Sequence, residues 1–293
     1  MPTAVPRPRR SLLFMPGTNA RAMEKARELA ADGVIFDLED SVAPDAKEGA
    51  RAQIAAALGH GGYGKRELLL RVNGAGTQWH DADLRFAATL PIDGVVLPKV
   101  EEARDVSASD AVLGAAGAPL GLSLWCMMET PRAILHAEAI AGASARLAGL
   151  IVGTEDLAKD LRARPRPDRL PFIPSLGIAL LAARAAGLVA LDSVYPDFKD
   201  EDGFAAQCRQ GRDLGFDGKT LIHPRQIATA NALFAPEPRE IEEARRVIAA
   251  FDTAEAAGRG VATLDGKMVE RLHADAARRL LALAADIAER DAR

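Results

Sequence analysis

The sequence predicts an α/β protein, a closed (β/α)8 barrel of the TIM type with a C-terminal helical extension. Short apolar runs alternate with helical patterns along the chain, and eight such pairs can be counted. Alternating strand and helix patterns indicate a parallel sheet, and eight of them favour a closed barrel over a doubly wound sheet. The length of 293 residues suits one barrel with additions. The runs are apolar throughout, which is typical of strands buried on both faces.

Most of the predicted strands end at turn or helix signals. Pro16 and Gly17 close the first run, and Asn19 can cap a helix over residues 19–32. Pro131 opens the helical pattern after the fifth strand, since proline is tolerated at the first position of a helix. The predicted strands span residues 11–15, 34–38, 67–72, 94–97, 122–128, 147–152, 188–191 and 219–222. Further helical patterns span residues 43–58, 80–90, 101–116, 174–186 and 202–214.

Composition excludes several classes of protein. A hydrophobic content of 48% with 27% charged residues is that of a globular protein with an ample core. The net charge of −4 gives no reason to expect nucleic acid or an anionic membrane as a partner. Two cysteines imply neither a disulfide framework nor a thiolate metal cluster. The basic, proline-rich start lacks the apolar region of a signal peptide, so we expect residues 1–9 to form a disordered tail and the protein to be cytoplasmic.

Polar residues stand at the ends of nearly all predicted strands. In a parallel barrel, function gathers at the carboxyl ends of the strands, which all lie on one face. The sequence therefore predicts that these residues surround one site. The residues are Glu39, Asp40, Arg71, Asn73, Lys99, Glu129, Asp156, Asp192 and His223.

Two carboxylates among neutral neighbours are the strongest candidates for metal ligands. Glu129 follows one apolar run directly, and Asp156 lies four residues past the next run. Their oxygens suit a magnesium ion that keeps waters and bidentate substrate oxygens. The alternative is that both residues only cap helices, because acidic side chains favour helix starts.

The chain continues for a long stretch beyond the last predicted strand. We therefore expect a barrel over residues 10–235 and a helical extension or lid over residues 236–293. Two amphipathic helices are predicted, over residues 236–257 and 269–290, with a break at Gly258-Arg259-Gly260. Their apolar stripes must be buried, either on the same barrel or on a neighbouring subunit. The sequence alone does not choose between these two arrangements.

Together these segments resemble a known family. RSLLFMPG, GVIFDLEDSVAPDAK, LLLRVN, GVVLPKVE, METPRA, GTEDL and GFDGKTLIHPRQI are similar to the citrate lyase β-subunit-like family, within the HpcH/HpaI aldolase/citrate lyase superfamily. The resemblance covers residues 10–281 and implies a Mg²⁺-dependent barrel that makes or breaks a C–C bond next to a thioester. It implies that Glu129 and Asp156 hold the metal and that Arg71 holds the substrate carboxylate. It also implies that Glu39 and Asp40 orient metal-bound water.

The C-terminal segment TLDGKMVE resembles one that carries a catalytic acid in the lyases of this family and closes over a neighbouring subunit's site. Family members have an aspartate in a Met-Ile-Asp triplet, whereas this chain has Met268-Val269-Glu270. Glu270 is thus a candidate catalytic acid with a longer side chain. The resemblance also implies a homotrimer or a hexamer, with a CoA thioester and a small 2-oxo acid as partners.

Three functions fit these residues. The first is a Mg²⁺-dependent lyase that splits a 3-hydroxyacyl-CoA such as malyl-CoA or citramalyl-CoA into an acyl-CoA and a 2-oxo acid. The second is a thioesterase on the same substrates, and the third is the β-subunit (citryl lyase) of a citrate lyase complex. Arg71 offers a planar fork for a carboxylate, although it could instead pair with Glu39 or Asp40. Glu270 or Asp40 would act as the general base.

An arginine-rich loop at residues 162–169, with Lys25 and Lys99, is a candidate contact for the phosphates of CoA. The alternative for this loop is a solvated surface. For His223, contact with the substrate and a structural role are both open.

Overall fold

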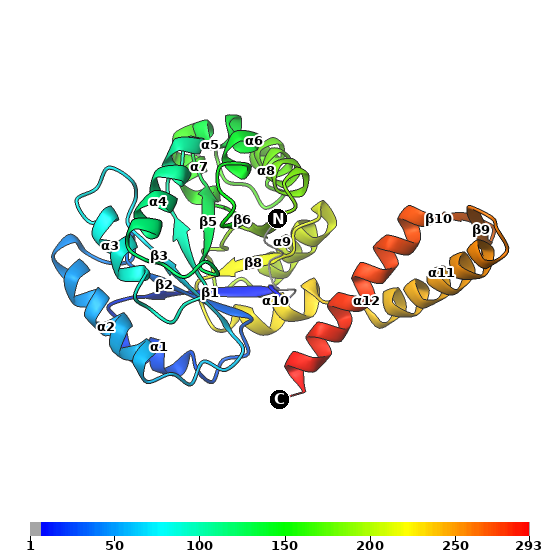
Figure 1. Ribbon diagram of the computed structural model, residues 1–293, viewed down its shortest axis with the longest axis horizontal. Helices are drawn as coiled ribbons and strands as arrows, with labels where there is room; N and C mark the ends of the chain where they lie inside the picture. Colours follow the sequence, from blue (N-terminus) through cyan, green and yellow to red (C-terminus); the bar gives the residue numbers. More distant parts are fainter. Residues whose placement is uncertain (1–6, 293) are drawn as a thin grey trace. The chain divides into compact units, whose positions relative to one another are not determined.

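The computed structural model describes residues 7–292 and contains a closed barrel of eight parallel strands, paired in the order β1 to β8 with β8 returning to β1. The predicted fold is therefore confirmed (Figure 1). The strands are β1 Ser11–Pro16, β2 Gly33–Asp37, β3 Glu67–Arg71, β4 Gly94–Leu97, β5 Ser123–Met128, β6 Leu147–Val152, β7 Val189–Asp192 and β8 Gly218–Leu221.

Alternate side chains of each strand point into the barrel or toward the helices, as the two-residue period of a strand requires. The inner set forms a core of its own, and the outer set packs under the helices. Trp125 fills the barrel interior beside Gly149, where an added Cβ would lie 2.2 Å from the indole ring. The inner core consists of Leu12, Ile35, Leu69, Val96, Trp125, Met127, Ile151 and Leu191.

Helices lie outside the strands in Figure 1. They are α1 Ala20–Lys25, α2 Lys47–Gly59, α3 His80–Ala87, α4 Ala103–Ala115, α5 Pro131–Leu135, α6 Ala137–Ala141, α7 Thr154–Leu161, α8 Ile173–Ala185, α9 Glu201–Leu214 and α10 Gln226–Phe234, with 3-10 turns η1 Pro44–Ala46 and η2 Leu170–Phe172. The helix expected over residues 19–32 was too long, because α1 ends at Lys25. After Lys25 the backbone hydrogen bonds change to the i→i−3 pattern of a tighter turn, with Arg27 bonded to Glu24 and Glu28 to Lys25. The carbonyl of Leu29 then accepts a hydrogen bond from the side chain of Arg66.

Ion pairs lie at the amino end of the barrel. Arg9 pairs with Glu67 at 2.6 Å, and Arg10 pairs with Asp32 at 2.9 Å. All four side chains are buried. The expectation of a disordered tail to residue 9 was therefore wrong for Arg9, because its charge is neutralised inside the barrel mouth. The first six residues of that predicted tail lie outside the described residues.

The chain divides into two compact units between Phe234 and Ala235. The second unit contains α11 Pro238–Ala256, a hairpin of β9 Val261–Leu264 and β10 Lys267–Glu270, and α12 Arg271–Asp291. The expected pair of helices is present, and the segment between them forms a hairpin that turns at Asp265 and Gly266, both with positive φ. The core of this unit consists of Phe251, Ala254, Ala262, Val269 and Ala274.

Within residues 7–292, none of the helices is sufficiently long and apolar to span a lipid bilayer.

Candidate active site

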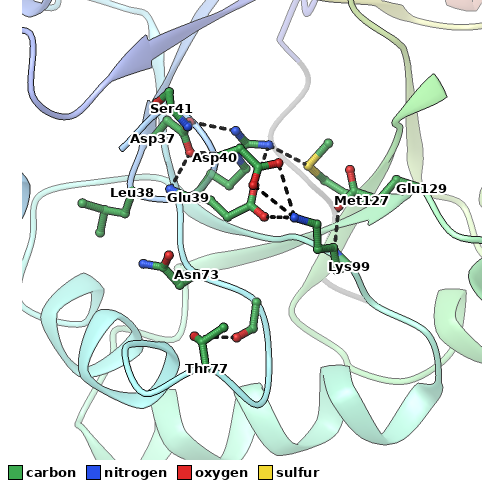
Figure 2. Close-up of polar contacts among 12 residues, drawn as sticks. Asp37, Leu38, Glu39, Asp40, Ser41, Asn73, Thr77, Lys99, Met127 and Glu129 are labelled. Atoms are coloured by element: carbon green, nitrogen blue, oxygen red, sulfur yellow. Dashed lines mark hydrogen bonds and ion pairs between the residues drawn. The ribbon is translucent and has the colours of Figure 1, made fainter. Parts of the chain in front are cut away.

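Residues from the carboxyl ends of several strands line a cavity of about 330 Å³. Four of the predicted site residues line it: Asp40, Arg71, Glu129 and Asp156. Figure 2 shows Asp37, Glu39 and Asp40 gathered on one side, facing Lys99, Met127 and Glu129. The lining consists of Phe14, Pro16, Asp37, Asp40, Ser41, Arg71, Met127, Glu129, Val152, Gly153, Thr154, Glu155, Asp156, Val194, Thr220 and Ile222.

Glu129 follows β5 directly and is buried, with 2% of its surface exposed. Its Oε1 accepts a hydrogen bond of 2.7 Å from the backbone N–H of Lys99, a residue with a φ of 51°. Gly153 leaves room for the side chain, because an added Cβ would lie 2.6 Å from Glu129 Oε2. Burial, reinforced by the charge of Glu39, raises the pKa of Glu129 to about 7. A cation in the cavity would favour the ionised form of this carboxylate.

Asp156 lies in the first turn of α7, is half-buried, and lines the same cavity as Glu129. Across the described part of the chain, no three His, Cys, Asp or Glu side chains are grouped to hold a metal ion. Two carboxylates alone still fit magnesium, which keeps several waters and binds through one or two protein carboxylates. The hard oxygen donors of Glu129 and Asp156 therefore fit this ion.

Arg71 is the last residue of β3, and the register of the barrel places it beside Asp37, the last residue of β2. Arg71 Nε and Nη2 each donate to one oxygen of Asp37, both at 2.7 Å. Arg71 Nη1 lies 3.0 Å from Glu39 Oε2 and 3.7 Å from Met127 Sδ. The sequence-based alternative of a pairing with Glu39 is thus present, but the main partner is Asp37. That residue was not singled out from the sequence, although its place at a strand end was a usable signal.

Glu39 is buried and held between two cations. Lys99 Nζ lies 2.5 Å from Glu39 Oε1, and Arg71 Nη1 is near Oε2. Glu39 Oε2 has no hydrogen-bond donor of suitable geometry among the described residues. Burial raises the pKa of Glu39, and the charges of Arg71 and Lys99 oppose that effect. Oε2, which lies in an ion pair with Arg71 but accepts no hydrogen bond from the described residues, suits a water molecule such as one bound to a metal ion.

Asp40 is exposed and shares the ammonium group of Lys99, with Oδ1 3.1 Å from Nζ. Lys99 is therefore engaged with the two acidic residues, as Figure 2 shows. Behind them, the buried Lys47 donates at 2.8 Å to the carbonyls of both Leu38 and Glu39 and fixes this loop. Lys47 was also not predicted from the sequence.

Three residues predicted at strand ends have structural partners instead. The side chain of Asn73 donates to Asp83 at 2.6 Å, and His223 stacks on Phe198 with ring centroids 4.4 Å apart. Asp192 accepts hydrogen bonds from Arg169 and Lys219, and all three side chains are buried. None of the three predicted residues lines the cavity.

The arginine-rich loop is only partly available to a ligand. Arg169 is buried against Asp192 at 2.6 Å, and Arg166 forms an exposed pair with Asp168. Arg162, Arg164 and Lys25 are exposed, so the predicted contact with CoA phosphates remains open to these side chains.

Glu270 belongs to the second unit, where it ends β10 and caps α12. Its backbone N–H donates to His273 Nδ1 at 3.0 Å. Its predicted role as a catalytic acid stays a prediction.

A closed parallel barrel with a cavity of acidic and arginine side chains at its carboxyl end defines a TIM-barrel type of enzyme site. The chain belongs to the HpcH/HpaI aldolase/citrate lyase family, whose model matches residues 10–224. This confirms the family resemblance found in the motifs.

Individual relatives extend the comparison over nearly the whole chain. A (3S)-malyl-CoA thioesterase of Cereibacter sphaeroides is 53% identical over 281 residues, 96% of either chain. The citrate lyase subunit beta of Escherichia coli is 39% identical over 283 residues, 95% of this chain and 94% of that one.

Solved structures agree with this assignment. The CitE protein of Mycobacterium tuberculosis, in complex with magnesium, acetoacetate and coenzyme A, has a TM-score of 0.77 and 30% identity over 94% of this chain and 97% of that one. A citrate lyase beta subunit from M. tuberculosis with oxaloacetate and magnesium has a TM-score of 0.67 and 31% identity, over 78% of this chain and 98% of that one. Magnesium is thus bound by solved members of this family.

Proposed function

We propose that this chain is a Mg²⁺-dependent enzyme that cleaves a 3-hydroxyacyl-CoA thioester of the malyl or citramalyl kind into an acyl-CoA and a 2-oxo acid. The observation that carries this proposal is the convergence of Arg71 with Glu129 and Asp156 on one cavity. A 2-hydroxy or 2-oxo acid offers a carboxylate for the arginine and neighbouring oxygens for a metal ion. The relatives named for citrate lyase and malyl-CoA support the same substrate class.

The cavity lining suits the acyl part of such a substrate. Arg71 has one edge on Asp37, so a substrate carboxylate would bind the second proton of Nη2 and share Nη1 with Glu39. Gly153, Thr154 and Glu155 at the start of α7 also line the cavity, and the amino end of a helix favours an anion. The remaining wall includes a group of apolar side chains. This wall includes Phe14, Pro16, Met127, Val152, Val194 and Ile222.

Glu129 and Asp156 would hold the magnesium ion, and Glu39 would orient its water through Oε2, which accepts no hydrogen bond from the described residues. When bound, the ion supplies Lewis acidity that polarises the substrate oxygen next to the carboxylate. Arg71 neutralises the carboxylate and fixes its orientation. Together these charges favour the negative charge that develops on the substrate oxygen in the transition state.

A general base must accept the proton of the 3-hydroxyl group. Asp40 lines the cavity and is exposed, but it must first give up its ion pair with Lys99. Glu270 is the other candidate, and in our proposal it reaches the cavity of a neighbouring subunit in a homotrimer or hexamer. Exposed apolar residues near it support such a docking role, with Val261 48%, Met268 61% and Leu272 62% exposed. A cover of this kind would exclude water from the enolate that cleavage produces.

Hydrolysis of the same thioester is a second candidate function. It is favoured by the name of the relatives that are 51% to 53% identical, all (3S)-malyl-CoA thioesterases. The two functions share the substrate, the metal and Arg71, and differ in whether water reaches the thioester.

One assay separates these functions. The purified chain is incubated with malyl-CoA and Mg²⁺, glyoxylate is measured as its phenylhydrazone, and CoA is measured as free thiol. Cleavage yields glyoxylate with acetyl-CoA and no thiol, whereas hydrolysis yields thiol with malate and no glyoxylate. Addition of EDTA, or replacement of either Glu129 or Asp156 by Ala, must stop the reaction. A chain that forms neither product refutes the proposal and leaves the citrate lyase β-subunit, which acts within a larger complex.

A further inference from the structure

We propose that Asp37 is a positioning residue that sets the orientation of the Arg71 guanidinium and so determines how the substrate carboxylate is bound. This inference rests on the proposed function, in which Arg71 binds that carboxylate. Asp37 itself need not touch the substrate. It acts by occupying one edge of Arg71 and leaving the other edge for the ligand.

Asp37 is 1% exposed and accepts hydrogen bonds from two directions. On one side, Arg71 Nε binds Oδ1 and Nη2 binds Oδ2, both at 2.7 Å. On the other side, the backbone N–H of Glu39 donates to Oδ1 at 2.9 Å, and the hydroxyl of Ser41 donates to Oδ2 at 2.5 Å. A single carboxylate therefore holds both the arginine and the loop that carries Glu39 and Asp40.

The barrel explains why this pair forms. Asp37 and Arg71 are register partners at the ends of adjacent parallel strands, so neither side chain has to cross the barrel. The guanidinium is further restricted by the ring of Phe14, whose centroid lies 4.7 Å from Arg71 Cζ. With the Nε edge on Asp37 and one face on Phe14, the Nη1 end of Arg71, which lies 3.0 Å from Glu39 Oε2, is the part that a ligand carboxylate would share.

Charge supports the same role. The pKa of Asp37 would be raised by burial, but the hydrogen bonds and charge of Arg71 outweigh that effect and hold the pKa below its ordinary value. Asp37 therefore stays ionised and keeps accepting at both oxygens. An asparagine in its place would present one NH₂ group to donors, and that group can accept from neither Arg71 nor the loop.

The chain contains a matched control at the opposite end of the same strand. Asp32 immediately precedes β2, is fully buried, and accepts from Arg10 Nε and Nη2, both at 2.9 Å. Asp32→Asn and Asp37→Asn thus disrupt the same kind of buried aspartate–arginine pair. Asp32 lies at the amino end of the barrel, away from the cavity.

The test compares the kinetics and thermal stability of Asp37→Asn, Asp32→Asn and wild type with malyl-CoA and Mg²⁺, using whichever product the chain forms. Both variants should be less stable than wild type. Only Asp37→Asn should raise KM, on the order of ten- to a hundred-fold, which is the range expected for a charged hydrogen bond. Unchanged KM in a folded Asp37→Asn enzyme overturns the proposal.

A double-mutant cycle with Arg71→Lys tests whether Asp37 acts through Arg71. If it does, Asp37→Asn should change KM less than about two-fold in the Arg71→Lys background. Multiplying effects would mean that Asp37 acts independently and would overturn the proposal. If Arg71→Lys alone leaves KM unchanged, or malyl-CoA is not turned over, the proposed function itself fails and the inference fails with it.

A measurement on the wild-type chain covers the case in which Asp37→Asn does not fold. The Nε–H signal of Arg71 in an NMR spectrum, assigned by its absence in Arg71→Lys, should exchange slowly because Asp37 holds that proton. Saturation with oxaloacetate and Mg²⁺ should leave this exchange slow, since the ligand takes the Nη1 end. Loss of the signal on ligand addition would show that the carboxylate displaces Asp37, and would overturn the proposal.

Discussion

Replacing Glu129 by Gln should stabilise the metal-free protein at pH 8 while removing its capacity to bind magnesium. The carboxylate is 2% exposed and accepts a hydrogen bond from the backbone N–H of Lys99, and the nearby charge of Arg71 only partly offsets the cost of its burial. Gln is nearly isosteric, and its carbonyl can still accept from the backbone N–H of Lys99. The substitution therefore removes the buried charge while retaining the shape and the hydrogen bond.

The pKa of Glu129 gives the magnitude. It is about 7, compared with an ordinary value of 4.5, a difference of about 2.5. Because one pKa unit corresponds to about 1.4 kcal/mol, ionising this buried group costs on the order of 3 kcal/mol. A raised pKa in the folded state contributes stability that is fully present below pH 4.5 and lost as the pH rises through 7. The advantage of Gln should thus be near zero at pH 4.5 and complete above pH 7.

Urea denaturation in EDTA at pH 5 and pH 8 measures this difference, and calorimetric titration measures Mg²⁺ binding. The Gln variant should exceed wild type by on the order of 3 kcal/mol at pH 8 and by much less at pH 5. Magnesium should stabilise wild type and leave the variant unchanged. Glu138→Gln, at an exposed position on α6, should alter neither property. A Glu129→Gln variant that is less stable than wild type at pH 8, or that still binds Mg²⁺, refutes this reasoning.

Three further outcomes are expected. Arg71→Lys should lower kcat/KM by on the order of a hundred-fold with Mg²⁺ affinity little changed, because a point charge cannot bind Asp37 and a ligand carboxylate at once. Near wild-type kinetics would show that Arg71 has a structural role only. Gly153→Ala should weaken Mg²⁺ binding measured by calorimetry, since the added Cβ would lie 2.6 Å from Glu129 Oε2 and displace that carboxylate. The control is Gly177→Ala, because an added Cβ at Gly177 meets nothing within 4 Å. Removal of residues 235–293, the C-terminal part of the second unit, should reduce the oligomer size in light scattering and the lyase activity while the barrel still folds. A monomeric full-length chain, or full lyase activity without the unit, would contradict the proposed cover.

The barrel could be predicted from the amino-acid sequence, together with several residues that line its cavity. Apolar runs separated by helical patterns imply parallel strands, and parallel strands bring all their carboxyl ends to one face. Glu129 and Asp156, on successive strand–helix units, could therefore be expected to meet, and both line the cavity. Arg71 and Asp40 were found by the same rule. This inference needs only the polarity of the strands and no knowledge of individual contacts.

Which strand-end residues face the cavity, and which partners they bind, could not be predicted without the three-dimensional structure. Asp192 is the last residue of β7 and Thr220 the last but one of β8, yet Thr220 lines the cavity whereas Asp192 packs with Arg169 and Lys219. Successive side chains of a strand point to opposite faces, so an uncertainty of one residue in a predicted strand reverses inside and outside. The pairing of Asp37 with Arg71 depends likewise on the register between two strands, which the closure of the barrel sets and which is not encoded in either segment alone.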